Sequence, residues 1–163
     1  GASVNLNDAE RSLKANSPEG IGILEVRKLP IFSKSLAEVV NYTAYEVKIP
    51  CTAPEDKQKL EETIKAFLAR SEIIIVHQSK SGAKSIDVKD LIAVLEISEF
   101  DAETKTAALK IELRLKQGKS VRLQEILTSL LDKAEADVDV LSMKRTGLFI
   151  ESNSALRSPW TIS

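Results

Sequence analysis

The chain has 163 residues, of which 43% are apolar and 29% are charged, and this composition is typical of one globular domain. Its formal net charge of −1 excludes a global field that would attract nucleic acid or acidic lipid. The single cysteine, Cys51, excludes an internal disulfide, and no apolar run is long enough to cross a membrane. These features predict a cytoplasmic protein with no membrane partner.

The first twenty residues are predicted to form a preamble to the domain. Asn7 to Glu10 has the pattern of a capping box, in which Asn7 would cap a short helix that ends by Ala15. The sequence Ser-Pro-Glu-Gly at 17–20 then favours a turn, because proline cannot continue a helix. Residues 21–29 follow as a predicted strand.

The next elements alternate between strand and helix. After a short helix near residues 36–40, residues 43–50 alternate between apolar and polar side chains and predict a half-buried strand. A helix over 56–70 follows, with Leu60, Ile64, Phe67 and Leu68 along one stripe. The continuous apolar run 73–76 predicts a central strand, and the polar stretch 79–85 predicts an exposed loop.

The second half of the chain repeats this pattern. Residues 91–97 and 106–115 are predicted as strands that a turn at 101–104 joins. A helix over 121–135 follows, and its apolar stripe includes Leu127, Leu130 and Leu131. Residues 138–150 predict the last strand, and residues 152–163 are predicted to be a loose tail.

The order of these elements predicts an α+β fold over residues 21–151. From residue 43 the order is strand, helix, strand, strand, strand, helix, strand. Removing one strand leaves two split βαβ units, which is the ferredoxin-like plan with an extra strand. In that plan both helices pack on one face of the sheet, and the opposite face is left open.

The residue types that carry common chemistries are scarce. A zinc site needs about four ligands, whereas this chain has one histidine, His77, and one cysteine, Cys51. His77 could serve as the base of a catalytic triad, and Cys51 precedes a helix N-terminus that could lower its pKa, but a structural role is favoured for both. We therefore expect no catalytic residue, no metal and no cofactor in this chain.

Basic residues gather in two stretches. Lys80 and Lys84 flank the predicted loop, and the segment 105–122 carries six basic residues, among them Arg114 and Arg122. On an open sheet face these side chains would form a surface that contacts phosphate groups. The alternative is a solubilising face, on which long basic side chains cover apolar area. No aromatic residue accompanies them, so stacking on RNA bases is not predicted.

Three short stretches, residues 18–30, 80–88 and 144–148, resemble a known family. They are similar to the C-terminal half of an uncharacterised domain, DUF2344-like, which is linked to or fused behind radical S-adenosylmethionine proteins with a cobalamin-binding-like region. The likeness spans about Pro18 to Glu151. The chain has neither the histidine-containing segment with which that domain usually begins nor the three-cysteine iron–sulfur signature of the radical domain.

The resemblance implies a non-catalytic accessory module that presents RNA or another macromolecular substrate to a radical S-adenosylmethionine domain, in cis or in trans. The iron–sulfur cluster and S-adenosylmethionine would then belong to the parent protein. The positions that correspond to the family pattern add Asp87, Arg122 and Arg145 to the candidate substrate-binding residues Lys80, Lys84 and Arg114. The alternative is a structural or interaction domain that docks on its own catalytic partner or self-associates. A contiguous basic face would favour the first role, and an exposed apolar patch the second.

Overall fold

The computed structural model describes residues 5–28, 34–51, 53, 55–79, 82–116, 119–134, 137–153 and 155–159, without the side chains of 77–79. The chain divides into two units, which are residues 1–35 together with Ser163, and residues 36–162. The first unit contains one helix, α1 (Leu6–Asn16), among its described residues. The side chain of Asn5 accepts a hydrogen bond from the backbone N–H of Asn7 at 3.1 Å, so the helix begins earlier than the predicted capping box.

The strand that the sequence predicted over 21–29 is absent from the described residues 21–28, which form neither helix nor strand. Leu24 in this segment is 96% exposed. None of the described strands pairs with the segment. The prediction was wrong because a strand needs a neighbour to satisfy its backbone N–H and C=O groups, and local propensity supplies none.

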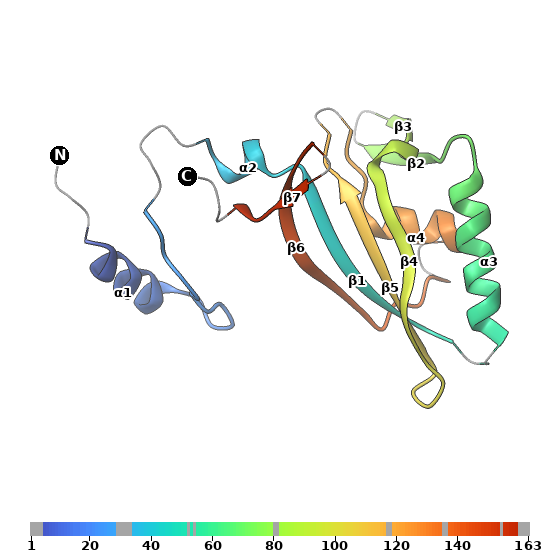
Figure 1. Ribbon diagram of the computed structural model, residues 1–163, viewed down its shortest axis with the longest axis horizontal. Coiled ribbons are helices and arrows are strands. Elements are labelled where there is room, and N and C mark those ends of the chain that lie inside the picture. The colour runs from blue at the N-terminus through green and yellow to red at the C-terminus, as the bar shows by residue number, and fades with distance from the viewer. Residues whose placement is uncertain are drawn as a thin grey trace. The chain divides into compact units, whose positions relative to one another are not determined.

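The second unit is built on a five-stranded antiparallel sheet (Figure 1). Its order is β4-β5-β1-β6-β7, so the first strand of the unit lies at the centre. The bounds of its strands are β1 (Tyr42–Pro50), β4 (Ile92–Asp101), β5 (Thr106–Arg114), β6 (Ser142–Ser152) and β7 (Ala155–Arg157). A short helix, α2 (Leu36–Val39), precedes β1, and a 3₁₀ turn, η1 (Lys89–Leu91), precedes β4.

The alternation of β1 and β5 gives this sheet one apolar and one polar face. Val47 pairs with Leu109 and both are fully buried, whereas the neighbouring pair Glu46 and Lys110 lies on the opposite face. We call that second face the open face. A period of two residues places successive side chains on opposite sides of a strand, so the sequence pattern predicted both faces correctly.

Both long helices, α3 (Glu55–Ala69) and α4 (Leu123–Leu131), cover the apolar face. Figure 1 shows them on the same side of the sheet. They bury Leu60, Ile64, Phe67, Ile126, Leu127 and Leu130 in one core with the strands. Leu131 is only partly buried, because α4 ends there and Asp132 adopts a left-handed conformation with φ of 51°.

Without β2, β3 and β7 the chain reads β1-α3-β4-β5-α4-β6, with the sheet order β4-β5-β1-β6. This is the pair of split βαβ units that the sequence predicted, in an α+β fold. The segment at 155–157, predicted as part of a loose tail, pairs with β6 as the short strand β7.

The extra strand does not lie where the sequence predicted it. The run 73–76 belongs to β2 (Ile74–Ser79), which pairs only with β3 (Gly82–Asp87) in a separate two-stranded sheet. The polar segment predicted as a loop is therefore largely β3, and the run is not a central strand. Ile73 and Ile75 are buried, whereas Ile74 and Val76 are exposed. All four residues are apolar, so the sequence pattern does not indicate which side of the strand is buried.

Candidate protein-docking groove

Arg114 points to the open face, where an acidic residue from another strand binds it. Its Nε donates to Glu151 at 2.8 Å and its Nη2 donates to the second carboxylate oxygen at 3.1 Å. This two-point hydrogen bond lowers the pKa of the Glu151 carboxyl. Asn41 holds the backbone of Glu151 through two further hydrogen bonds, at 2.7 and 3.1 Å. The charge of Arg114 is thus neutralised within the chain.

The neighbouring lysines are paired in the same way. Lys110 lies 2.9 Å from Glu112, and Lys116 and Lys119 lie 2.7 and 3.2 Å from Asp90. The hydrogen bond from Lys116 is the main reason that the pKa of Asp90 is lowered. Most of the positive charge that the sequence shows between residues 105 and 122 therefore meets an acidic side chain of the same molecule.

Asp87 fastens the base of the β2–β3 hairpin. Its carboxylate accepts from the backbone N–H of Ile73 at 2.9 Å and from that of Lys89 at 3.0 Å. These two hydrogen bonds lower the pKa of Asp87. Lys84 is exposed on β3, opposite His77 in the strand register, and Lys80 lies outside the described residues. The position of Asp87 therefore has a clear structural use.

Arg145 lies on β6 and does not share a face with Arg114. It pairs with Tyr45, and a bulge beside Ala44 separates this pair from the next part of the β1–β6 ladder. In a regular strand Phe149, four residues after Arg145, would lie on the same face as Arg145. The bulge places it on the opposite face, where its ring meets Tyr42 edge-on at 6.3 Å. Of the predicted candidates that the structure describes, Arg114 lies on the open face, Arg145 on the helix side of β6 and Arg122 at the start of α4, and Lys84 and Asp87 lie on the hairpin.

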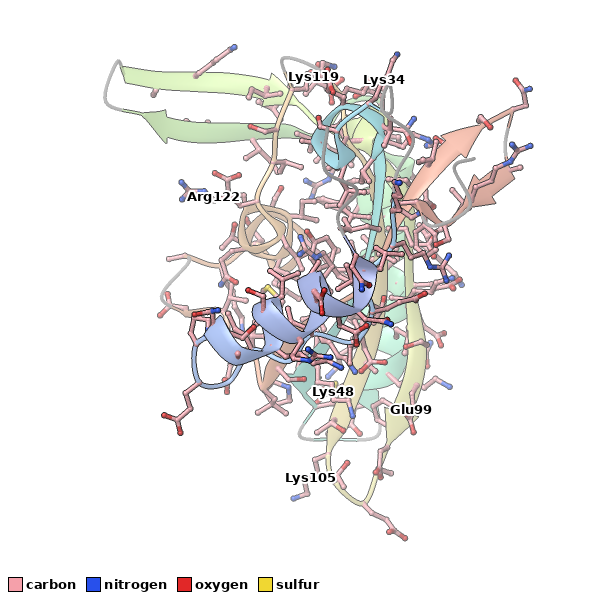
Figure 2. The ribbon with its side chains drawn as sticks, turned by 90° about the vertical axis from the view of Figure 1, so that its left-hand side faces the viewer. Lys34, Lys48, Glu99, Lys105, Lys119 and Arg122 are labelled. Atoms are coloured by element: carbon pink, nitrogen blue, oxygen red, sulfur yellow. The ribbon has the colours of Figure 1, made fainter. Side chains whose placement is uncertain are left out.

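A groove of about 400 Å³ lies where the hairpin meets α4. We call it the hairpin–helix groove. It is lined by Ile74, Ile75, Val76, Arg122, Glu125, Thr128, Ser129 and Lys133. In Figure 2 the labelled Arg122 lies between the hairpin and α4. Ile74, Ile75 and Val76 are successive residues of β2, so their side chains point alternately to the two faces of the hairpin. A groove that all three residues line must therefore run along the edge of β2, not over one face.

The helical wall of the groove is the polar stripe of α4. The helix turns its apolar stripe to the core, which leaves Glu125 and Ser129 on the outside, and Arg122 and Lys133 flank its two ends. The backbone N–H of Arg122 donates to the Glu125 carboxylate at 2.8 Å, which caps the start of the helix. The sequence analysis selected Arg122 but missed Ile74 and Val76. Residues 73–76 are all apolar, so no alternation with polar residues indicates which of them are exposed.

One family model, described as an uncharacterized protein conserved in bacteria (DUF2344), matches residues 2–125. The chain belongs to this family. The DUF2344 match includes Lys80, Lys84, Asp87, Arg114 and Arg122 and ends within the first turn of α4, so Arg145 and the stretch 144–148 lie beyond it. A search of curated proteins finds no match.

The described residues of this DUF2344 member contain no group of three or more His, Cys, Asp or Glu side chains arranged to hold a metal ion. None of its described helices is long and apolar enough to cross a membrane. Cys51 is buried, and burial, followed by the nearby Asp56 carboxylate, raises the pKa of its thiol. This direction opposes the lowered pKa that a reactive cysteine needs.

Proposed function

We propose that this chain is a non-catalytic module that docks on a protein partner through the hairpin–helix groove. The observation that carries the proposal is the exposure of Ile74 and Val76, at 45% and 55%, beside a polar helical wall. An apolar strip bordered by polar side chains is the usual composition of a protein interface. A partner that covers these side chains would remove both from water.

The partner that the family resemblance suggests is a radical S-adenosylmethionine protein, joined to this module in cis or binding it in trans. In this proposal the partner holds the iron–sulfur cluster and S-adenosylmethionine, and the module orients the substrate or stabilises the partner. Presentation of RNA has less support, since Lys110, Arg114, Lys116 and Lys119 all pair with acidic residues of the chain.

Isothermal titration calorimetry with the purified radical S-adenosylmethionine protein tests this proposal. We expect binding by the unchanged chain and a large loss of affinity in Ile74→Glu, because a charge would be buried in the interface. Leu156→Glu is the matched control, since Leu156 is also exposed, at 43%, but lies on β7 outside the groove.

Equal affinity of the two variants would overturn the role of the groove, and the absence of any binding would overturn the partner. A parallel titration with structured RNA separates the two macromolecules. Tight, steeply salt-dependent RNA binding that Arg122→Glu abolishes and Ile74→Glu leaves intact would favour RNA presentation instead.

A further inference from the structure

The β2 strand has one edge without a neighbouring strand among the described residues. The backbone N–H of Val88 donates to the carbonyl of Ile73 at 2.9 Å, which makes these two residues a hydrogen-bonded pair. Bonded and non-bonded pairs alternate along an antiparallel ladder. The register of β2 and β3 therefore makes Ile75 and Ile86 a bonded pair, and leaves Ile74 and Val76 in non-bonded pairs.

The backbone groups of Ile74 and Val76 consequently point away from β3. The β2–β3 sheet has only two strands, and within the described part of the chain no other strand pairs with β2. Each of these two residues thus offers one N–H donor and one C=O acceptor along the edge that borders the hairpin–helix groove. An unpaired strand edge is a template for another chain.

We propose that the edge of β2 binds an extended segment of a partner protein as a third strand of the hairpin sheet. This inference rests on the proposed function and specifies how the partner is recognised. Main-chain hydrogen bonds to Ile74 and Val76 hold the segment, and its alternate side chains contact the exposed apolar side chains of these two residues. Because Ile74, Ile75 and Val76 all line the groove, an extended segment lying in it would run alongside β2 and could pair with its edge.

The charges on the groove select for acidic residues in the bound segment. Arg122 and Lys133 both line the groove, and the Glu125 carboxylate is occupied by the backbone N–H of Arg122. An Asp or Glu of the segment can therefore reach a cation on the helical wall. The expected segment combines β-branched residues at alternate positions with at least one acidic residue.

A display library of random ten-residue peptides, selected against the whole chain, supplies the probe. We expect the enriched peptides to show alternating β-branched residues together with acidic ones. Amide hydrogen exchange, followed by NMR, then locates the binding. The amides of Ile74 and Val76 should exchange at least about tenfold more slowly when an enriched peptide is bound, because they acquire hydrogen-bond partners. The amide of Ile75 is the internal control, because it is already bonded to β3.

Two proline variants distinguish the free edge of β2 from that of β3. Val76→Pro removes an outward-pointing donor and leaves the hairpin hydrogen bonds in place. Ser85→Pro does the same on β3, because Ser85 is the register partner of Val76. We expect Val76→Pro to weaken peptide binding about tenfold or more, and Ser85→Pro to leave it unchanged. Because a proline can disturb the hairpin, Arg122→Glu is a second variant, and it should weaken the acidic peptides without touching a strand.

Failure to enrich any peptide, or unchanged exchange of Ile74 and Val76 with peptide bound, would overturn strand addition. Equal effects of Val76→Pro and Ser85→Pro would also overturn it. These failures remain distinct from failure of the proposed function. If the radical S-adenosylmethionine protein binds and Ile74→Glu prevents it while the exchange of both amides stays the same, docking stands and strand addition is wrong. If that protein does not bind but the peptides add to β2, strand addition stands and the partner is wrong.

Discussion

Removing the hydroxyl of Tyr42 should destabilise the fold through one hydrogen bond on the open face. Tyr42 is the first residue of β1 and is 4% exposed, and its hydroxyl donates to the carboxylate of Glu112 on β5. Glu112, whose side chain is 12% exposed, also accepts from Lys110 at 2.9 Å. A hydrogen bond to a charged, mostly buried group is worth about 1.5–3 kcal/mol, which we expect as the cost of Tyr42→Phe at pH 7.

The cost of Tyr42→Phe should depend on pH. Burial raises the pKa of Glu112, but the hydrogen bonds from Tyr42 and Lys110 together outweigh it, so the pKa lies below its ordinary value of 4.5. A carboxyl whose pKa is lowered by folding stabilises the protein fully above its unfolded pKa, and this stabilisation is lost as the pH falls through the folded pKa. The difference between wild type and Tyr42→Phe should therefore shrink as the pH falls below the ordinary carboxyl pKa of 4.5 and through the lower pKa of Glu112 in the folded state.

Urea denaturation at pH 7 and at pH 3.5, with thermal melts alongside, measures this difference. A loss of 1.5–3 kcal/mol corresponds to a fall in Tm of roughly 3–12 °C for a chain of this length. Tyr45→Phe is the matched control on the same strand, because its hydroxyl has no partner among the described residues. Equal costs for the two variants, or a cost for Tyr42→Phe that stays constant with pH, would refute the reasoning.

Three further predictions concern the core, the hairpin and the cysteine. Leu127→Ala should lower the free energy of unfolding by about 2–5 kcal/mol, since Leu127 is fully buried, and Leu131→Ala should cost less because Leu131 is only partly buried; denaturant titration compares them. Asp87→Ala should lower Tm because two backbone N–H groups lose their acceptor, whereas Lys84→Ala on the exposed strand should leave Tm unchanged. Cys51 should react with Ellman's reagent much more slowly in the native protein than in urea, because burial raises the pKa of its thiol; equal rates would contradict this.

The sequence predicted the main sheet and both long helices because the apolar residues of these elements recur at the spacing of a strand or of a helix, which identifies the buried side of each. The alternation in β1 and β5 and the helical spacing of Leu60, Ile64 and Phe67 depend only on neighbours along the chain. The strands β3 and β7 carry little such signal. In β3 the polar residues Lys84, Ser85 and Asp87 do not alternate with apolar ones and its first four residues are exposed, so only the pairing with β2 makes it a strand.

The candidate site was less predictable than the fold. The run of basic residues selected Arg114 and the family resemblance added Arg145, but the surroundings of both depend on contacts between segments that are distant in sequence. Arg114 meets Glu151, thirty-seven positions away, and the bulge in the β1–β6 ladder moves Phe149 to the face opposite Arg145. The number of basic residues in a segment does not predict which acidic residue each of them pairs with, nor the register in which a strand pairs.

The sequence by itself determined the α+β class, the apolar face of each long element and the scarcity of histidine and cysteine, because composition and local periodicity are enough for these properties. Only the tertiary structure decided that Ile74 and Val76 are exposed at a strand edge and that Lys116 and Lys119 share the single carboxylate of Asp90. The physical reason is that the exposure of a side chain, the lack of a hydrogen-bond partner for a backbone group and the local net charge all depend on which segments lie side by side. Segments distant in the sequence become neighbours only in the folded structure.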